Sequence, residues 1–354
     1  MVVAIAVIGV SFVVSAFLTC LLRKHGEKYG IMDFPNSRSS HAVPTPRGGG
    51  LSIVVTFGVA VLLLVVNKRL AAGTAAALLG GGGLVAIVGL LDDRRPLRAS
   101  IRILVHFVAA GWSLWCLGGV PDLDLGWISW KWGWTGQMVA LIGLVWLVNL
   151  YNFMDGIDGL AATEAICAGG FGGMLLAAGG LAGLGLMAVG LAAACAGFLI
   201  WNWPPARIFM GDVGSGFLGF AFGVLIIASA KQGSWRVWPW VILLSVFVVD
   251  ATVTLLRRVW TGAPWYQAHR SHAYQHAARR WGSHLKVTLA VAGVNSVWLL
   301  PLAWAASAWP RLAPLLSVVA VAPLIWLAFR FHAGEAREEQ PASPRGTSGS
   351  GGFG

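Results

Sequence analysis

The stretch NLYNFMDGIDGL (residues 149–160) places two asparagines and two aspartates between two apolar segments. VALIGLVWLV precedes it and AATEAICAGGFGGMLLAAGG follows it, and both have the composition of membrane-crossing helices. A charged side chain at the middle of a bilayer costs about 2.5–3.5 kcal/mol, so these side chains must lie at the interface or line a cavity. The stretch therefore predicts a polar turn between two membrane spans.

The rest of the chain repeats this alternation of apolar segments and polar loops. Of its 354 residues, 57% are hydrophobic and 11% are charged, whereas a soluble domain has about 25% charged residues. Apolar runs of about 20 residues recur, the length that crosses a bilayer, and the short alternating segments of a β-barrel are missing. The prediction is an all-α polytopic integral membrane protein with about eleven transmembrane helices. The predicted spans are 2–22, 49–67, 71–91, 100–119, 135–151, 161–179, 181–200, 214–230, 238–256, 286–307 and 312–330.

Basic residues predict the orientation of these spans. Arg23 and Lys24 follow the first apolar segment and no basic residue precedes it, so it is predicted to be a retained span that starts outside. This orientation places 19 of the 25 Lys and Arg residues inside, and the C-terminus in the cytoplasm. One transmembrane domain (1–331) is expected, followed by a disordered tail (332–354). The predicted inside loops that carry the polar motifs are 23–48, 92–99, 152–160, 201–213 and 257–285.

The net charge of +11 is spread over short loops, which argues against nucleic acid and for anionic lipid headgroups and phosphates as partners. Nearly all acidic residues outside the spans fall on the predicted inside face, and only Asp250 is expected deep within a span. Asp92 and Asp93 are adjacent, so they predict a bound cation, a proton acceptor or a solvated helix end. Asp212, among glycines at a helix start, predicts either an N-cap or a metal ligand beside a phosphate.

Two inside loops are rich in arginine and histidine. In residues 33–53, Arg38, His41 and Arg47 are suited to holding phosphate, although an ordinary loop is the alternative. In residues 266–284, histidines 269, 272 and 276 would share one face of a helix; acidic and thiol partners for zinc are missing nearby, so a cationic surface fits better. Taken together, the polar motifs predict metal-assisted chemistry on a phosphate-bearing substrate at the cytoplasmic face.

DFPNSRSSHAVPTPRGGG, LDDRRPL, NLYNFMDGIDGLA, FMGDVGSGFLG and the histidine loop, in this order, resemble the polyprenyl-phosphate N-acetylhexosamine-1-phosphate transferases. This group, glycosyltransferase family 4, includes the phospho-MurNAc-pentapeptide translocase and the enzymes that initiate O-antigen, enterobacterial common antigen and teichoic acid synthesis. The resemblance implies a multi-pass enzyme of the bacterial inner membrane with its active site facing the cytoplasm. Such an enzyme transfers an N-acetylhexosamine 1-phosphate from a UDP-sugar to undecaprenyl phosphate, releases UMP and uses Mg²⁺, with Mn²⁺ as a substitute.

The resemblance also implies roles for individual residues. Asn152 and Asp212 correspond to the metal ligands, and Asp92, Asp93 and Asp212 to the catalytic aspartates. Phe209 corresponds to the residue that stacks on uracil, and Asp158 to the one that hydrogen-bonds the base; Asp155 is grouped with them as nucleotide-binding. The residues implied near the pyrophosphate and sugar are Arg38, His41, Arg47, His269, Arg270 and His272. Membrane lipids and a second copy of the chain complete the expected partners.

One loop departs from the family pattern. Many members carry Asp and then a run such as His-Ile-His-His, whereas here Ala268 replaces the Asp and HRSHAYQH (269–276) replaces the run. Because that loop is thought to read the sugar, a 6-deoxy sugar such as QuiNAc or FucNAc and a role in lipopolysaccharide O-antigen synthesis are expected. The alternatives are a phospho-MurNAc-pentapeptide translocase-like enzyme, disfavoured by the missing run of three histidines, and a transporter. The absence of a repeat and the carboxylates at the span ends disfavour a transporter.

Overall fold

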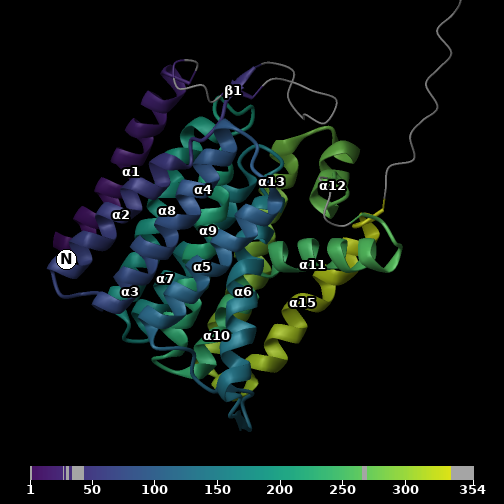
Figure 1. Cartoon of the computed structure of the whole chain (residues 1–354). Helices are drawn as coiled ribbons and strands as arrows, with labels where there is room; N and C mark the ends of the chain where they lie inside the picture. The colour runs from purple at the N-terminus through teal and green to yellow at the C-terminus, as the bar shows by residue number, and fades with distance from the viewer. Residues whose placement is uncertain (1, 27, 29–31, 34–43, 265–268, 336–354) are drawn as a thin grey trace, which may run out of the picture.

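The computed structural model describes residues 2–26, 28, 32–33, 44–264 and 269–335. Figure 1 shows a bundle of helices in which α9 occupies an interior position and α1 and α15 lie on opposite flanks. The first helices of the bundle are α1 (Val2–Lys24), α2 (Leu51–Val66), α3 (Ala72–Ala76), η1 (Ala77–Gly81), α4 (Gly82–Arg94), α5 (Ala99–Leu117) and α6 (Gly133–Phe153). They are followed by α7 (Leu160–Ala178), α8 (Ala182–Asn202), α9 (Asp212–Ala230), η2 (Ser234–Arg236), α10 (Val237–Leu243) and α11 (Ser245–Trp260). The last are α12 (Ala273–Trp281), α13 (His284–Gly293), η3 (Val294–Leu299), α14 (Leu300–Ala308), η4 (Pro310–Leu312) and α15 (Ala313–Arg330).

The all-α membrane fold predicted from the sequence is confirmed, but two of the eleven predicted segments are not long straight helices. Within the described residues, nine helices are long and apolar enough to cross a membrane. The predicted span 49–67 is a 16-residue helix, α2. The predicted span 238–256 bends by 72° between α10 and α11, where the backbone of Leu244 (φ −95°, ψ 2°) leaves the helical region. In Figure 1, α11 consequently runs across the direction of the other helices.

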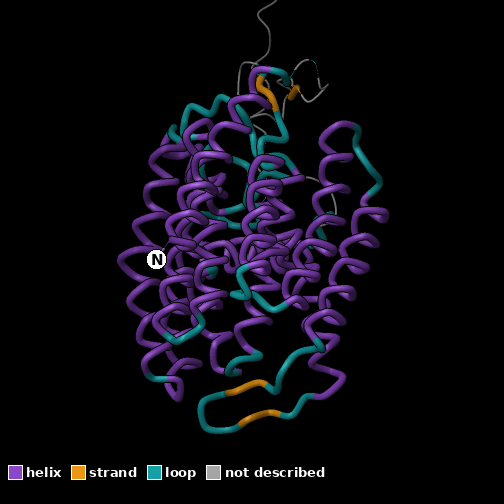
Figure 2. The backbone as a smooth tube through the Cα atoms, turned by 90° about the vertical axis from the view of Figure 1, so that its left-hand side faces the viewer, coloured by secondary structure: helices purple, strands orange, loops and turns teal. Residues whose placement is uncertain are grey.

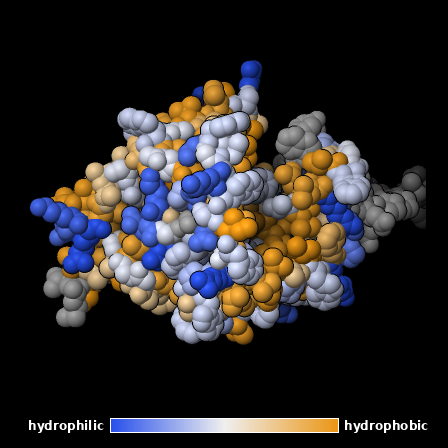
Figure 3. Space-filling model, turned by 90° about the horizontal axis from the view of Figure 1, so that it is seen from below, coloured by the Kyte–Doolittle hydropathy of each residue, from blue (hydrophilic) through white to orange (hydrophobic). Residues whose placement is uncertain are grey.

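Two short antiparallel hairpins mark the ends of the bundle (Figure 2). Strand β1 (Met32–Asp33) pairs with β2 (Thr45–Pro46), and β3 (Leu123–Asp124) pairs with β4 (Ser129–Trp130) at the opposite end. Trp127 and Trp130 of the β3–β4 hairpin are 72% and 56% exposed, as expected for tryptophans at a membrane interface. Seen from this end, hydrophilic residues cover the middle of the face and apolar residues lie beside them (Figure 3).

A buried acidic residue lies in α7, outside the polar motifs of the sequence. Glu164 of α7 is completely buried, and its Oε2 accepts a hydrogen bond of 2.7 Å from Nδ2 of Asn295 in η3. Asp250 is therefore not the only acidic residue inside the bundle. Because lipid offers no alternative partner for a polar side chain, this contact ties α7 to the η3 segment.

We predict that Asn295→Ala destabilises the protein by about 1–3 kcal/mol, because it leaves the buried carboxyl of Glu164 without a partner. Glu164→Gln, which can still accept the hydrogen bond, serves as the matched control and should cost less. Unfolding in mixed detergent micelles measures both. An Asn295→Ala variant as stable as the wild type would show that the contact does not hold the two helices together.

Candidate active site

The first turn of α9 is capped by a carboxylate from another helix. Oδ1 and Oδ2 of Asp93 in α4 accept hydrogen bonds from the backbone N–H groups of Asp212 (2.9 Å) and Val213 (3.1 Å). The side chain of Asp93 is fully buried, and a carboxylate at this position satisfies free amides and the positive end of the helix dipole. Gly211 precedes the helix at φ +77°, and a Cβ there would lie 2.5 Å from Asp93 Oδ2. Asp212 is thus the first helical residue rather than the N-cap, which leaves its own carboxylate available for other partners.

Two arginines join the three predicted catalytic aspartates into one cluster. Arg47 donates from Nε to Asp93 (2.8 Å) and from Nη2 to Asp212. Arg102 of α5 donates from one nitrogen to both Asp92 (2.7 Å) and Asp212 (3.1 Å). We call Asp92, Asp93 and Asp212, with Asn152 and Asp155 beside them, the acid cluster. From the sequence, Arg102 contributes only to the predicted orientation of the spans. Its position in the first turn of the helix that follows Asp92 could have indicated that it contacts this aspartate.

Backbone pairing brings Arg47 to this cluster. The N–H of Phe209 donates to the carbonyl of Pro46 (2.8 Å), and the N–H of Gly49 donates to the carbonyl of Phe209 (2.9 Å). The segment before α2 therefore runs beside the segment before α9. This backbone pairing holds Arg47 and Phe209 side by side; both residues are predicted from the sequence to bind substrate.

The opening stretch of the sequence divides at the end of α6. The helix ends at Phe153, so Asn152 is helical and Asp155 and Asp158 lie in the turn that follows. Nδ2 of Asn152 donates to Ser215 Oγ (3.1 Å), and the Asn152 side chain lies within hydrogen-bonding reach of Asp212. The structure thus brings together the two residues implied as metal ligands.

Asp155 lies close enough to Arg47, Asp93 and Asp212 to interact with their charges. Burial raises the pKa of Asp155 well above its ordinary value, Arg47 opposes this, and the carboxylates of Asp212, Asp93 and Asp158 add to it. None of the described residues hydrogen-bonds its side chain. A carboxylate held in this way is suited to accept a cation or a proton from a bound ligand.

The donor set of the cluster fits Mg²⁺. Carboxylate and amide oxygens are the ligands that Mg²⁺ prefers, and it is commonly held by one or two carboxylates together with substrate phosphates and water. Asp212 supplies a carboxylate, and Asn152, which donates through Nδ2, retains its oxygen for a ligand. No group of three or more His, Cys, Asp or Glu side chains in a metal-binding arrangement occurs in the part of the chain that the structure describes. A metal here would therefore also need oxygens from its substrate.

A polar pocket of about 670 Å³ opens near the cluster. Phe209 and Asp158, which are both expected to contact the base, line this pocket. Asp158 Oδ2 accepts from the N–H of Ala206 (3.1 Å) and lies 3.3 Å from Nδ1 of His284. His284 was not predicted, since 126 residues separate it from Asp158 and no local pattern links them. Asp155 is not among the described residues that line this pocket.

Residues of the histidine loop line the same pocket. Arg270, Gln275 and Arg279 line it. The three histidines do not share a helix face, as had been expected, because α12 begins only at Ala273 and His272 is its N-cap. The rings of His269 and His272 stack instead, with centroids 5.1 Å apart. Burial, together with the neighbouring His272 and Arg258, lowers the pKa of His269 to about 4. Arg38, His41 and Ala268 lie outside the described residues.

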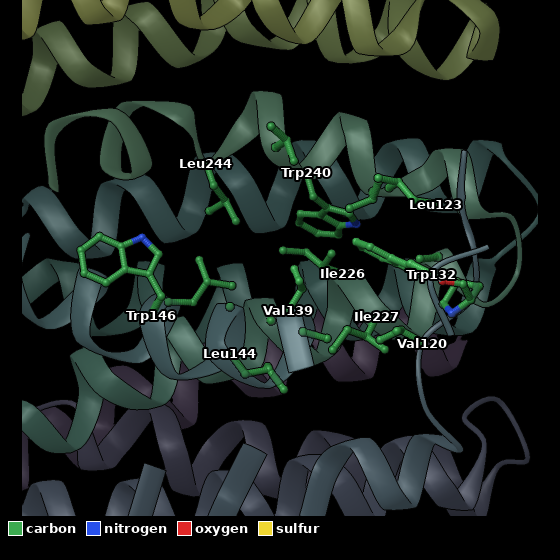
Figure 4. Close-up of a pocket in the computed structure, with 18 of the residues that line it drawn as sticks. Val120, Leu123, Trp132, Val139, Leu144, Trp146, Ile226, Ile227, Trp240 and Leu244 are labelled. Atoms are coloured by element: carbon green, nitrogen blue, oxygen red, sulfur yellow. Dashed lines mark hydrogen bonds between the residues drawn. The ribbon is translucent and has the colours of Figure 1, made fainter. Parts of the chain in front are cut away.

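An apolar pocket of about 300 Å³ lies within the bundle, between α6, α9, α10 and α11. Figure 4 shows Val139, Leu144 and Trp146 on one side of it and Trp240 and Leu244 on the other. It extends from residues 120–123, near the β3–β4 hairpin, to Val248 of α11. Its walls are almost entirely aliphatic and aromatic, so it suits a hydrocarbon ligand.

The chain resembles known proteins along most of its length. It is 25% identical over 283 residues to a probable undecaprenyl-phosphate N-acetylglucosaminyl 1-phosphate transferase of Bacillus subtilis, covering 75% of this chain and 76% of the relative. It is 29% identical to a decaprenyl-phosphate N-acetylglucosaminephosphotransferase of Mycolicibacterium smegmatis, covering 81% of this chain and 78% of the relative. A phospho-N-acetylmuramoyl-pentapeptide-transferase of Moorella thermoacetica is 32% identical, over 49% of this chain and 58% of the relative.

The family model described as glycosyl transferase family 4 matches residues 75–230. This region contains Asp92, Asp93, Asn152 and Asp212, the residues that the structure gathers at the start of α9. The motifs, the relatives and the family model agree in what they resemble: over residues 75–230, a little less than half of its length, the chain matches glycosyl transferase family 4.

Proposed function

We propose that this protein transfers an N-acetylhexosamine 1-phosphate from a UDP-sugar to undecaprenyl phosphate and releases UMP, with Mg²⁺ as cofactor. The observation that carries the proposal is the acid cluster at the start of α9, with Arg47 and Arg102 around it and the pocket of Phe209 and Asp158 beside it. The relatives named above act on polyprenyl phosphates, which supports the same class of acceptor here.

The reaction joins two anionic substrates, and the cluster is built to reduce that repulsion. An oxygen of the polyprenyl phosphate attacks the sugar-bearing phosphorus, the bond from that phosphorus to the bridging oxygen breaks, and UMP leaves. Mg²⁺, when bound to Asp212 and Asn152, would stabilise the charge that develops on the phosphate oxygens. Arg47 and Arg102 add fixed positive charge beside it. We favour direct attack over a covalent intermediate, because a phosphate needs little activation at neutral pH.

The two pockets supply candidate sites for the rest of each substrate. The polar pocket offers Phe209 as a stacking surface and Asp158 as a hydrogen-bond acceptor for uracil. The apolar pocket between α6, α9, α10 and α11 suits part of the polyprenyl chain. A UDP-sugar is a cytoplasmic metabolite, so we propose that the acid cluster faces the cytoplasm across the bacterial inner membrane. The altered histidine loop further supports a 6-deoxy donor sugar and a role in O-antigen synthesis.

We predict that purified protein with Mg²⁺ and undecaprenyl phosphate releases UMP from at least one of UDP-GlcNAc, UDP-QuiNAc and UDP-FucNAc. UDP-MurNAc-pentapeptide is added to the donor panel because one relative is named a phospho-N-acetylmuramoyl-pentapeptide-transferase. Release of UMP from the pentapeptide donor alone would favour the alternative function, that of a phospho-MurNAc-pentapeptide translocase-like enzyme. If every donor is inert with the wild type, the proposed function is wrong.

We predict that Asp212→Asn lowers kcat by about 10²–10³-fold or more, because it removes the charge that Arg47 and Arg102 contact and that Mg²⁺ would need. Asp124→Asn is the matched control, since Asp124 lies in the hairpin at the other end of the bundle and an amide there can still accept from Gly126. UMP release and thermal unfolding are measured on both variants. Near-normal turnover by folded Asp212→Asn would remove this residue from the reaction centre.

A further inference from the structure

Asp250 of α11 is buried and saturated with hydrogen bonds. Its Oδ1 accepts from the N–H of Ala273 (2.9 Å) and lies 3.3 Å from Nδ1 of His272; its Oδ2 accepts from the N–H of Tyr274 (2.9 Å). Oγ1 of Thr254 in its own helix also donates to Oδ1 (3.2 Å). Both backbone donors, and the His272 ring, belong to the start of α12. Asp250 therefore caps α12 from a neighbouring helix, and a carboxylate is favoured there by the free amides and the helix dipole.

The same end of α12 is tied to the end of α6, just before the turn that carries Asp155. The hydroxyl of Tyr274 donates to the carbonyl of Phe153 (2.9 Å), the last residue of α6. A Cβ on Gly156 would lie 2.1 Å from that hydroxyl, so only glycine allows this approach. Because the N–H of Tyr274 is held by Asp250, the position of Asp250 also fixes where this hydroxyl lies.

A second side chain of α11 holds the segment that leads into α12. Nη2 of Arg258 donates to the carbonyl of Pro264 (3.0 Å), and Nη1 donates to Ser271 Oγ (3.4 Å). Ser271 Oγ in turn lies 3.0 Å from Nδ1 of His269. Arg258, Ser271 and His272 are all buried. Asp250 and Arg258 of α11 thus form a buried binding site, here called the socket, for the described part of the histidine loop.

The socket fixes the position of α12, and residues of α12 form one wall of the polar pocket. Arg270 precedes the capped helix, and Gln275 and Arg279 lie on its first two turns; all three line the pocket that Phe209 and Asp158 also line. We propose that Asp250 is a positioning residue for donor binding, which holds α12 and His272 so that this wall faces the UDP-sugar. The proposal rests on the proposed function for the identity of the ligand. Within the described residues, no hydrogen bond joins Asp250 directly to the helices of the acid cluster; its link to α6 runs through Tyr274 and the carbonyl of Phe153. Its loss should therefore affect the donor wall more than the acid cluster.

The first measurement needs no substrate. Hydrogen–deuterium exchange of the purified full chain is compared between wild type, Asp250→Ala and Thr254→Val, the last removing only the hydrogen bond that Asp250 receives from its own helix. We expect Asp250→Ala to speed exchange in residues 273–281 while α6 and α9 keep their protection, and Thr254→Val to match the wild type. Unchanged exchange in α12, or faster exchange throughout the bundle, would overturn the proposal. Asp250→Asn, which retains one acceptor oxygen, replaces Asp250→Ala if the latter does not fold.

The second measurement is the KM for each substrate. We expect Asp250→Ala to raise the KM for the UDP-sugar about tenfold, the cost of ordering one or two loosened side chains on binding, and to leave the KM for undecaprenyl phosphate unchanged. An equal rise in both KM values, or no rise in either, would overturn the proposal. A wild-type enzyme that is inert with every donor would overturn the proposed function instead, and the exchange experiment would still decide whether Asp250 holds α12.

Discussion

The contact between Asp93 and the first amides of α9 is the interaction on which the acid cluster depends. Because a residue of α4 caps this helix, the carboxylate of Asp212 is not used for capping and can face Arg47 and Arg102. The same contact places the end of α4 beside the start of α9. Asp92, which directly precedes Asp93, is thereby brought within reach of Arg102. One buried carboxylate thus holds the adjacent pair Asp92 and Asp93 beside Asp212, which is 119 residues from Asp93 in the sequence.

A second helix in the molecule is capped in the same way. Asp250 of α11 caps α12 as Asp93 of α4 caps α9, and in each case the capping carboxylate is buried. Both capped helices begin near the polar pocket: Gln275 of α12 lines it, and α9 begins three residues after Phe209, which also lines it. Helix starts have free amides that attract anions, so an uncapped start in this region would compete for the phosphates of the substrate. Under the proposed function, fixed carboxylates at these two starts leave Arg47, Arg102 and the proposed Mg²⁺ as the groups that bind phosphate.

Much of this arrangement could be predicted from the sequence. The apolar runs predicted the helices, and the motifs around Asp92, Asn152 and Asp212 predicted residues that the structure brings together. The bend at Leu244 was missed because the run 238–256 carries no breaking residue at that point, and Pro239 lies at its start. The role of Asp93 as a cap could not be predicted, since 119 residues separate it from its partner. Glu164 and Arg102 were passed over because each looks ordinary in its local sequence, and only the packing of helices brings their partners near.

The central claim is that the cluster at the start of α9 holds a divalent cation against the diphosphate of a nucleotide sugar. It is tested most directly by loading the protein with Mn²⁺ and a UDP-sugar and recording the phosphorus couplings of the metal by electron–nuclear double resonance. The account predicts a phosphorus coupling in the wild type that is lost in Asp212→Asn and retained in Asp124→Asn. A coupling of unchanged strength in folded Asp212→Asn would contradict it.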